Sequence, residues 1–192
     1  MQKNVNTFVG TVGTKRETWQ TIKDETFYLT DFTADDYVLP MIMSEFFFEV
    51  YRGKRVKVYG FPRETRRRLH GQRRVFTYIY VVHLELADDE EPDCRYVEIE
   101  GKVASRNGKV ELGSDMDSKI HFELEYTVTF DKDVIITTPC RAFSKVARRL
   151  SNIQKGDPML IRGNITGGNG ALRVAVKNFE KLYEEEVDTN VG

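Results

Sequence analysis

A spaced pair of glycines occurs twice in this chain, and this repeat constrains the fold more than any other feature. Residues 52–60 read Arg-Gly-Lys-Arg-Val-Lys-Val-Tyr-Gly, and residues 155–163 read Lys-Gly-Asp-Pro-Met-Leu-Ile-Arg-Gly. Both follow the pattern basic–Gly–x–x–apolar–x–apolar–x–Gly. Upstream, residues 8–12 and 99–103 share the pattern apolar–x–Gly–x–apolar. Two matches in the same order indicate an internal duplication.

The acidic stretch Asp88-Asp89-Glu90-Glu91-Pro92-Asp93 is the best candidate for a linker between the two copies. A chain of 192 residues is long enough for two small domains with cores of their own. We therefore predict one domain over residues 1–92 and a second over residues 93–192. The second ends in a short acidic tail that contains Glu184-Glu185-Glu186.

Each half has the pattern of an all-β domain with at most a short helix. The period-2 alternation of half-buried strands is clearest at Ile120, Phe122, Leu124, Tyr126 and Val128, and it recurs at Val97, Ile99 and Val103 and at Leu172, Val174 and Val176. A helix is expected over residues 142–150, with Phe143, Val146, Ala147 and Leu150 on its apolar face, and a short one around residues 44–50. Three strands, a helix and a hairpin are the layout of the five-stranded Greek-key OB barrel. A mixed α+β sandwich is the alternative.

These segments resemble a known family. Residues 4–12, Asn-Val-Asn-Thr-Phe-Val-Gly-Thr-Val, are similar to the first strand of bacterial single-stranded DNA-binding proteins. Most of the second half resembles that family and its relative primosomal protein B, over residues 97–103, 143–156, 159–163 and 172–182. The resemblance implies an OB barrel that binds single strands without a cofactor and with tolerance of sequence. It also implies assembly of several barrels, which two fused barrels would supply within one chain.

The chain departs from the family pattern at two places. Its acidic tail is short and lacks an aromatic tip, which puts partner recruitment by that route in doubt. The outward side of the strand over residues 120–128 carries Glu123 and Glu125, which repel phosphates. The second barrel is therefore expected to bind weakly or through another face.

Sequence-tolerant binding needs cations along the phosphate path and aromatic faces on which bases stack. Residues 52–74 contain ten Lys or Arg and one acid, Glu64, although the net charge of the chain is −1. The long basic hairpin over residues 62–74 is expected to be mobile when free and to close over bound nucleic acid. The candidate binding residues are Lys15, Arg16, Trp19, Tyr59, Arg63, Arg66, Arg67, Arg68, Arg73, Arg74, Tyr78, Tyr80, Lys102, Arg106, Arg162, Arg173 and Lys177.

Two aromatic features of the first half have alternative interpretations. Trp19 lies in a polar segment that is expected to turn between the first two strands, where it either stacks on bases or caps the barrel. The strand over residues 75–84 alternates Val75, Thr77, Ile79 and Val81 with Phe76, Tyr78, Tyr80 and Val82. If the aliphatic face fills the core, the aromatic face is exposed or packs on a partner; alternatively, the aromatic rings belong to the core.

Catalysis and membrane insertion find little support in the sequence. His70, His83 and His121 are scattered, and no phosphate-binding glycine loop occurs, so we expect no enzyme, metal or cofactor. No apolar run approaches the ~20 residues that span a bilayer, and no secretory signal opens the chain. Cys94 and Cys140 have no metal-like spacing, and we interpret them as reduced thiols of a cytoplasmic protein.

The sequence predicts single-stranded DNA as the main partner, in replication, repair or recombination. RNA remains open as the ligand, and a homodimer and replication proteins remain open as partners. Two other classes stay as alternatives. One is an OB-fold adaptor in a replication or primosome complex, and the other is a subunit that delivers nucleic acid to a separate enzyme.

Overall fold

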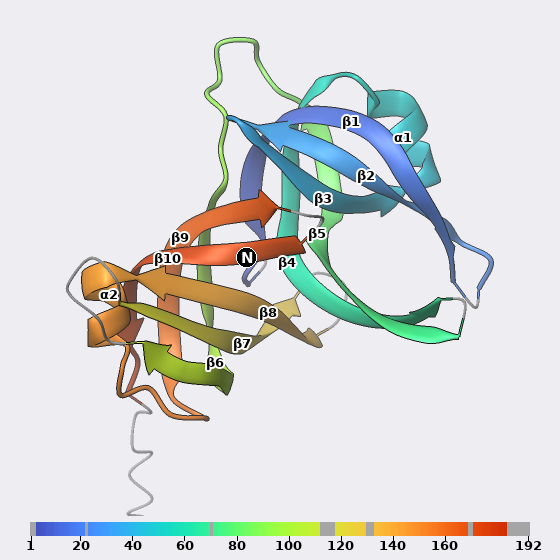
Figure 1. Cartoon of the computed structure of the whole chain (residues 1–192). Coiled ribbons are helices and arrows are strands. Elements are labelled where there is room, and N and C mark those ends of the chain that lie inside the picture. Colours follow the sequence, from blue (N-terminus) through green and yellow to red (C-terminus); the bar gives the residue numbers. More distant parts are fainter. Residues whose placement is uncertain are drawn as a thin grey trace, which may run out of the picture.

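The computed structural model describes residues 3–21, 23–69, 71–111, 118–129, 133–168 and 171–183. His70, Asn169, Gly170 and the acidic tail from Glu184 lie outside these ranges. The described residues form ten strands and two short helices (Figure 1), with these bounds: β1 Asn6–Gln20, β2 Thr26–Ala34, β3 Tyr37–Ser44, α1 Glu45–Tyr51, β4 Arg55–Leu69, β5 Gln72–Leu86, β6 Tyr96–Glu111, β7 Lys119–Thr129, β8 Asp133–Phe143, α2 Ser144–Arg149, β9 Pro158–Gly168 and β10 Ala171–Lys181.

The strands close into two barrels with the same order of neighbours. Barrel 1 runs β1-β2-β3-β5-β4, and barrel 2 runs β6-β7-β8-β10-β9. In each barrel the third strand pairs in parallel with the fifth, β3 with β5 and β8 with β10, while the other pairs are antiparallel. This confirms the predicted fold of two five-stranded OB barrels, each with one short helix before its last hairpin.

The repeated glycines occupy matching places in the two barrels. A Cβ on Gly60 would lie 2.3 Å from the carbonyl oxygen of Tyr80, and one on Gly163 would lie 2.2 Å from that of Ala175. Neighbouring backbones approach so closely there that no side chain fits. Gly53 and Gly156 both have a positive φ, +72° and +94°, which glycine adopts without steric cost.

The alternating residues fill the barrels as the sequence predicts. Ile120, Phe122, Leu124, Tyr126 and Val128 on β7 are all buried, as are the apolar residues of β6 and β10 that were singled out. Most of the buried apolar residues of both barrels belong to one continuous hydrophobic core. The two barrels are therefore joined by packed apolar side chains as well as by the chain between them.

The helix of each barrel is present: α1 lies one residue beyond the expected residues 44–50, and α2 is shorter than the expected residues 142–150. Ser44 caps α1, its hydroxyl accepting a hydrogen bond from the backbone N–H of Phe47, and Phe48 packs into the core. The placement of Phe143 on the buried face of the second helix was wrong. Phe143 ends β8 immediately before α2 and is exposed, because its strand, not the helix, sets its direction.

Polar contacts reinforce the junction of the barrels. The hydroxyl of Tyr126 donates to the carbonyl oxygen of Pro62, and the backbone N–H of Leu172 donates to Thr77 Oγ1 at 2.5 Å. Near the N-terminus, the Asn4 amide donates to two carbonyl oxygens of barrel 2 and accepts from the backbone N–H of Glu100. In Figure 1 the hairpin of β9 and β10 reaches from barrel 2 to barrel 1.

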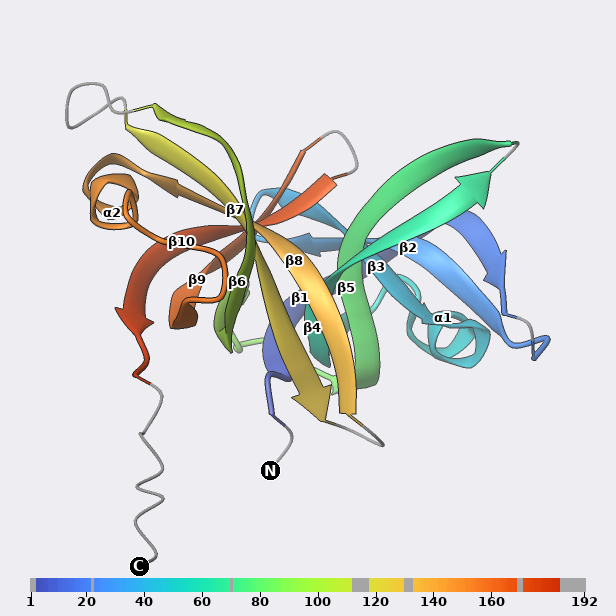
Figure 2. The ribbon, with the colours of Figure 1, turned by 90° about the horizontal axis from the view of Figure 1, so that it is seen from below.

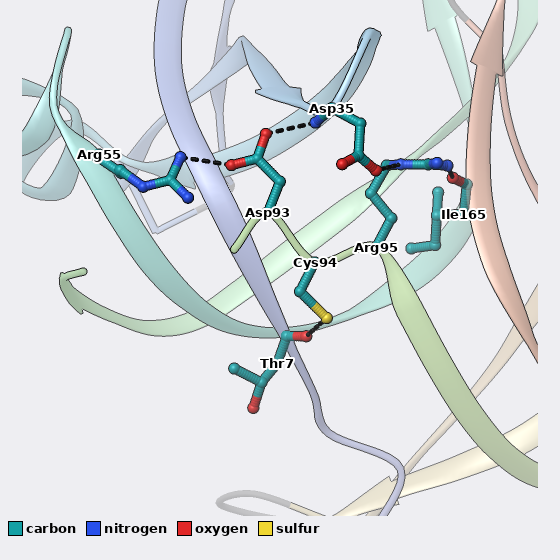
Figure 3. Close-up of polar contacts among 7 residues, drawn as sticks. All are labelled: Thr7, Asp35, Arg55, Asp93, Cys94, Arg95 and Ile165. Carbon is teal, nitrogen blue, oxygen red and sulfur yellow. Dashed lines mark hydrogen bonds and ion pairs between the residues drawn. The ribbon is translucent and has the colours of Figure 1, made fainter. Parts of the chain in front are cut away.

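The segment that connects the barrels is bound to both of them (Figure 3). Asp93 pairs with the guanidinium of Arg55 and accepts from the backbone N–H of Asp35, both in barrel 1. Arg95 donates to the Asp35 carboxylate and to the carbonyl oxygen of Ile165 in barrel 2, each at 2.7 Å, and stacks on Tyr37. The backbone of Cys94 pairs with that of Val9.

Arg95 should therefore contribute strongly to stability. Arg95→Ala leaves the carbonyl of Ile165 and the Asp35 carboxylate without this donor, and we expect a loss of about 2 kcal/mol in the free energy of unfolding, because hydrogen bonds to charged groups are stronger than neutral ones. Urea denaturation measures this. Arg162→Ala, which breaks an exposed ion pair with Glu98, is the control and should cost less than ~1 kcal/mol. Equal losses in both variants would contradict the role given to Arg95.

Candidate nucleic-acid interface

The basic hairpin of barrel 1 is a two-stranded ribbon that continues β4 and β5. Arg66, Arg67, Arg68 and Leu69 pair in register with Val75, Arg74, Arg73 and Gln72, and the turn passes through Gly71 at φ +80°. The segment predicted as a long basic hairpin thus has a regular antiparallel ladder. Its expected mobility and closure on nucleic acid remain predictions.

The ribbon has two faces because side chains alternate along a strand. One face points toward the end of β1. It carries Arg63, Thr65 and Arg67, with Tyr78 and Phe76 opposite them on β5. Glu64 and Thr77 form an opposed pair on the other face, which is turned toward barrel 2 since Thr77 bonds to Leu172. Val75 also belongs to this second face and is exposed. The interpretation in which the whole aliphatic face of this strand fills the core therefore does not hold at Val75, because the strand extends beyond the barrel there.

A groove of about 590 Å³ lies on the first face of the ribbon, between β4–β5 and the adjoining ends of β1 and β2. Tyr80 and Phe27 are half-buried there, with ring centroids 6.4 Å apart, and Tyr80 stacks on the buried Phe61. The remaining lining is mostly polar or basic: Trp19, Gln20, Thr21, Lys23, Glu25, Ile42, Arg63, Thr65, Arg67 and Tyr78. The groove thus combines aromatic faces with cations.

Trp19 lies within β1, and the expectation that it sits in a turn was wrong. β1 continues through the polar residues before it and pairs with β2 as far as Gln20. The indole is 8% exposed and packs edge-on against Phe76 and Tyr78, with ring centroids 5.2 and 5.4 Å away. Its Nε1–H donates to Glu17 Oε2, and the Arg67 guanidinium covers the ring at 4.3 Å from the centroid.

The aromatic residues of β5 form a second apolar cluster outside the barrel. The buried residues of this cluster are Trp19, Leu29, Ile42 and Tyr78. Packed against them are the partly buried rings of Phe27, Phe76 and Tyr80. Burial raises the pKa of the Tyr78 and Tyr80 phenols above the ordinary value of tyrosine. The cluster supports the floor of the groove and leaves only part of each aromatic ring accessible.

The tip of the ribbon concentrates positive charge. Arg67 is opposite Arg74 and Arg68 is opposite Arg73 on the two strands. Like charges in directly opposed positions repel and destabilise a sheet. A hollow of about 490 Å³ lined by Arg66, Arg67, Arg68, Gly71 and Arg73 adjoins them. Within the described residues, only Arg66 of these has an ion-pair partner, Glu64 at 3.6 Å. The tip is therefore suited to an anionic ligand.

Barrel 2 carries a different set of residues on the corresponding outer face. Register places Arg141 and Arg173 where barrel 1 has Ile42 and Tyr78. Burial and the neighbouring charge of Arg173 lower the pKa of Arg141, and its guanidinium lies 5.4 Å from the Phe143 ring. Neither arginine has an ion-pair partner among the described residues. This face is cationic with little aromatic surface.

Two carboxylates interrupt the positive surface between the barrels. Burial and the nearby charge of Glu123 raise the pKa of Glu64, while Arg66 opposes the shift. Glu123 accepts a hydrogen bond from the Ser105 hydroxyl at 2.7 Å. The sequence-based expectation that Glu123 disfavours phosphate near β7 is consistent with its place beside the ribbon.

The other candidate residues lie outside the groove lining. Lys15 lies 4.4 Å from the Tyr28 ring centroid, Arg16 pairs with Asp31, and Tyr59 stacks on His83 and donates to Glu85. In barrel 2, Arg106 donates to the Ser151 carbonyl oxygen, Arg162 pairs with Glu98 and Glu180, and Lys102 and Lys177 are exposed on β6 and β10.

Among the residues of these surfaces that sequence reasoning missed, four carry an aromatic ring or a positive charge. Phe27 and Lys23 line the groove, and Arg141 and Phe143 lie on the outer face of barrel 2. The alternation of β8, in which Ile136, Thr138, Cys140 and Ala142 are buried, could have identified Arg141 and Phe143 as outward residues. The contribution of Phe27 depends on tertiary packing that its neighbours in sequence do not reveal.

The described part of the chain shows neither a metal cluster nor a membrane helix. Among these residues, no three or more His, Cys, Asp or Glu side chains are grouped so that they could hold a metal ion. No helix in the described ranges is long and apolar enough to cross a membrane.

The fold and groove define a two-barrel OB protein with an aromatic and basic surface on barrel 1.

No protein-family model matches the sequence, and no curated protein matches it either. Among solved structures, the wild-type single-stranded DNA-binding protein from Thermus aquaticus matches with a TM-score of 0.69 and 13% identity, over 96% of this chain and 95% of that chain. A deletion mutant of the same protein gives the same TM-score and identity, over 96% of both chains. The protein priB from Ralstonia solanacearum covers 46% of this chain, with a TM-score of 0.41 and 14% identity. The resemblance seen in the sequence is thus confirmed for the fold, across both barrels.

The position of Arg67 predicts a change in Trp19 fluorescence. Arg67→Ala removes the guanidinium that covers the indole, so the emission of this sole tryptophan should shift to longer wavelength and acrylamide should quench it more strongly. Arg68→Ala, one residue along on the opposite face, is the matched control and should leave both properties unchanged. Identical spectra for the two variants would show that Arg67 does not cover Trp19 in solution.

Proposed function

We propose that this chain binds single-stranded DNA, with tolerance of sequence, through the groove and ribbon of barrel 1. The observation that carries the proposal is the combination of half-buried aromatic rings, Tyr80 and Phe27, with Arg63, Lys23 and Arg67 in one open groove. Bases of a single strand stack on accessible aromatic faces, while cations contact the phosphates. The fold likeness to a single-stranded DNA-binding protein supports this choice of ligand.

The geometry favours a single strand over a duplex. In a duplex the bases are stacked on one another, so the rings of Tyr80 and Phe27 could not receive them. A single strand can turn its bases into the groove and leave its phosphates toward Arg63 and the ribbon tip. We propose that stacking occurs on Tyr80 and Phe27, whereas Trp19 supports them from below, because Arg67 and the neighbouring rings cover its indole.

We further propose that residues 1–92 and 93–192 are the two domains and that barrel 2 contributes a weaker, mainly electrostatic contact through Arg141 and Arg173. This division of roles follows from the aromatic surface of barrel 1 and its absence from the equivalent described positions of barrel 2. The protein then acts as a non-enzymatic binding protein in replication, repair or recombination, and it needs no cofactor.

Removal of the Tyr80 ring tests the stacking contact. Tyr80→Ala should weaken binding of oligo-dT by ~1–3 kcal/mol, the typical contribution of one stacked base. Fluorescence anisotropy with a labelled oligonucleotide measures the affinity, and circular dichroism checks the fold. Tyr96→Ala, an exposed tyrosine on barrel 2, is the control. If both variants bind like the parent, the groove is not the base-binding surface.

The exposed arginines of the ribbon should determine the salt dependence of binding. Replacing Arg68, Arg73 and Arg74 by Ala should reduce the slope of log K against log salt by about 2, at ~0.7 per phosphate contact on a single strand. Titrations at several salt concentrations measure the slope. The matched control replaces Lys145, Arg148 and Arg149 of α2, which lies at the far end of the molecule (Figure 2).

The two triple variants remove the same number of charges, so a general effect of net charge would flatten both slopes equally. Such a result would count against a localised phosphate path on the ribbon. Competition between single-stranded and double-stranded oligonucleotides of equal length provides the decisive test of the ligand: a preference for the duplex contradicts the proposed function.

A further inference from the structure

One acidic side chain lies among the aromatic, polar and basic residues of the groove on barrel 1. Glu25 is the sole carboxylate among the described residues that line it, and it shares the groove with Lys23, Arg63 and Arg67. Glu25 is exposed and has no ion-pair partner in the part of the chain that the structure describes. A carboxylate repels phosphate, so contact with the strand backbone does not explain its place in the groove.

The backbone of Glu25 is fixed by hydrogen bonds between β1 and β2. Its N–H donates to Thr21 Oγ1 at 3.2 Å, and the N–H of Thr21 donates to the Glu25 carbonyl oxygen at 3.0 Å. The chain then enters β2 at Thr26. Glu25 and Phe27 are two residues apart, a spacing that places side chains on the same side of an extended segment, and both line the groove. The carboxylate is therefore held beside one of the two rings proposed to stack on bases.

The second of these rings, Tyr80, lies within range of the same charge. Burial raises the pKa of the Tyr80 phenol, Arg63 lowers it, and the negative charge of Glu25 adds to the rise. The centroids of the Tyr80 and Phe27 rings are 6.4 Å apart. Glu25 thus borders the place where a base stacked on either ring presents its edge.

The chemistry of a carboxylate determines which base edge it favours. Its two oxygens accept hydrogen bonds and offer no donor. Guanine presents two neighbouring donors on its Watson–Crick edge, the N1–H and the 2-amino group, and a carboxylate can accept from both at once. Adenine and cytosine present one amino group beside an acceptor, and thymine presents one N–H between two carbonyl oxygens that repel a carboxylate. In a single strand this edge is free to be read by a protein.

We propose that Glu25 gives the groove a preference for guanine, by accepting hydrogen bonds from the N1–H and the 2-amino group of a base that stacks on Phe27 or Tyr80. The proposal rests on the function proposed above, because it requires a single strand in this groove. The preference is added to the sequence-tolerant contacts with rings and phosphates, through which thymine still binds. Water competes for the exposed carboxylate, so we expect a preference of about tenfold, near the low end for a bidentate contact to a base.

Short oligonucleotides with spaced guanines test the preference, and the spacing prevents four-stranded guanine assemblies. Fluorescence anisotropy should show that a dT strand with such guanines binds about tenfold more tightly than pure dT of equal length. Hypoxanthine at the same positions keeps a purine ring for stacking and lacks only the 2-amino group, so it should lose most of the gain. Equal affinity of the parent chain for the guanine and hypoxanthine strands would overturn the proposal.

Two variants with the same change of charge assign the preference to Glu25. Glu25→Gln and Asp24→Asn each remove one negative charge, but Asp24 is not among the described residues that line the groove. Asn is also suited to the positive φ of residue 24, +59°. Both variants should bind pure oligo-dT slightly more tightly than the parent, for the same electrostatic reason. Only Glu25→Gln should bring the ratio of guanine to hypoxanthine affinity close to one. A Glu25→Gln chain that keeps the parent's ratio, or an Asp24→Asn chain that loses it, would contradict the role of Glu25.

The guanine preference and the proposed function can fail separately. A parent chain that binds oligo-dT through Tyr80 but does not distinguish guanine from hypoxanthine would overturn the role of Glu25 and leave the groove as a binding surface without base discrimination. If Tyr80→Ala binds every strand like the parent, the groove is not the base-binding surface, and both proposals are wrong.

Discussion

The continuous packing between the two barrels is the constraint on which the rest of the structure depends. Most of their buried apolar side chains form one core, and the segment that connects them is anchored on both sides by Asp93 and Arg95. Arg95 can do this because a guanidinium offers several donors in a fixed plane and stacks on an aromatic ring at the same time. The connection therefore orients the barrels, although its acidic composition resembles that of a flexible linker.

This fixed junction gives the ribbon of β4 and β5 two different environments. One face packs Phe76 and Tyr78 against Trp19, and the other is turned toward barrel 2 through Thr77. β4 and β5 can extend beyond the barrel because side chains on both faces of the ribbon make contacts near the end of the barrel. The accessible aromatic rings and the arginines are consequently held on a supported sheet. Their positions depend on the small cluster around Trp19 as much as on the barrel core.

The sequence predicted the barrels well because their cores depend on local alternation and on spaced glycines. The period-2 pattern of β7 identified five buried residues, and the glycine repeat located the close approach of backbones at Gly60 and Gly163. Trp19 was misplaced because β1 continues through polar residues that are usual in turns, and their strand conformation comes from pairing with β2. Arg141 was not predicted as a surface residue for a related reason. It lies near Arg173 because β8 and β10 pair in parallel, and the sequence around either residue does not indicate that pairing.

The opposed arginines at the ribbon tip have a consequence for the kinetics of binding. Clustered charge attracts any flexible polyanion over a distance of about a Debye length and accelerates encounter, with little selectivity. The partly covered rings of the groove act only after contact, and they govern how long a strand stays bound. On the proposed function, the ribbon would set the association rate and its salt dependence, whereas the groove would set the dissociation rate. Nucleic acid is then distinguished from other polyanions by how long it stays bound.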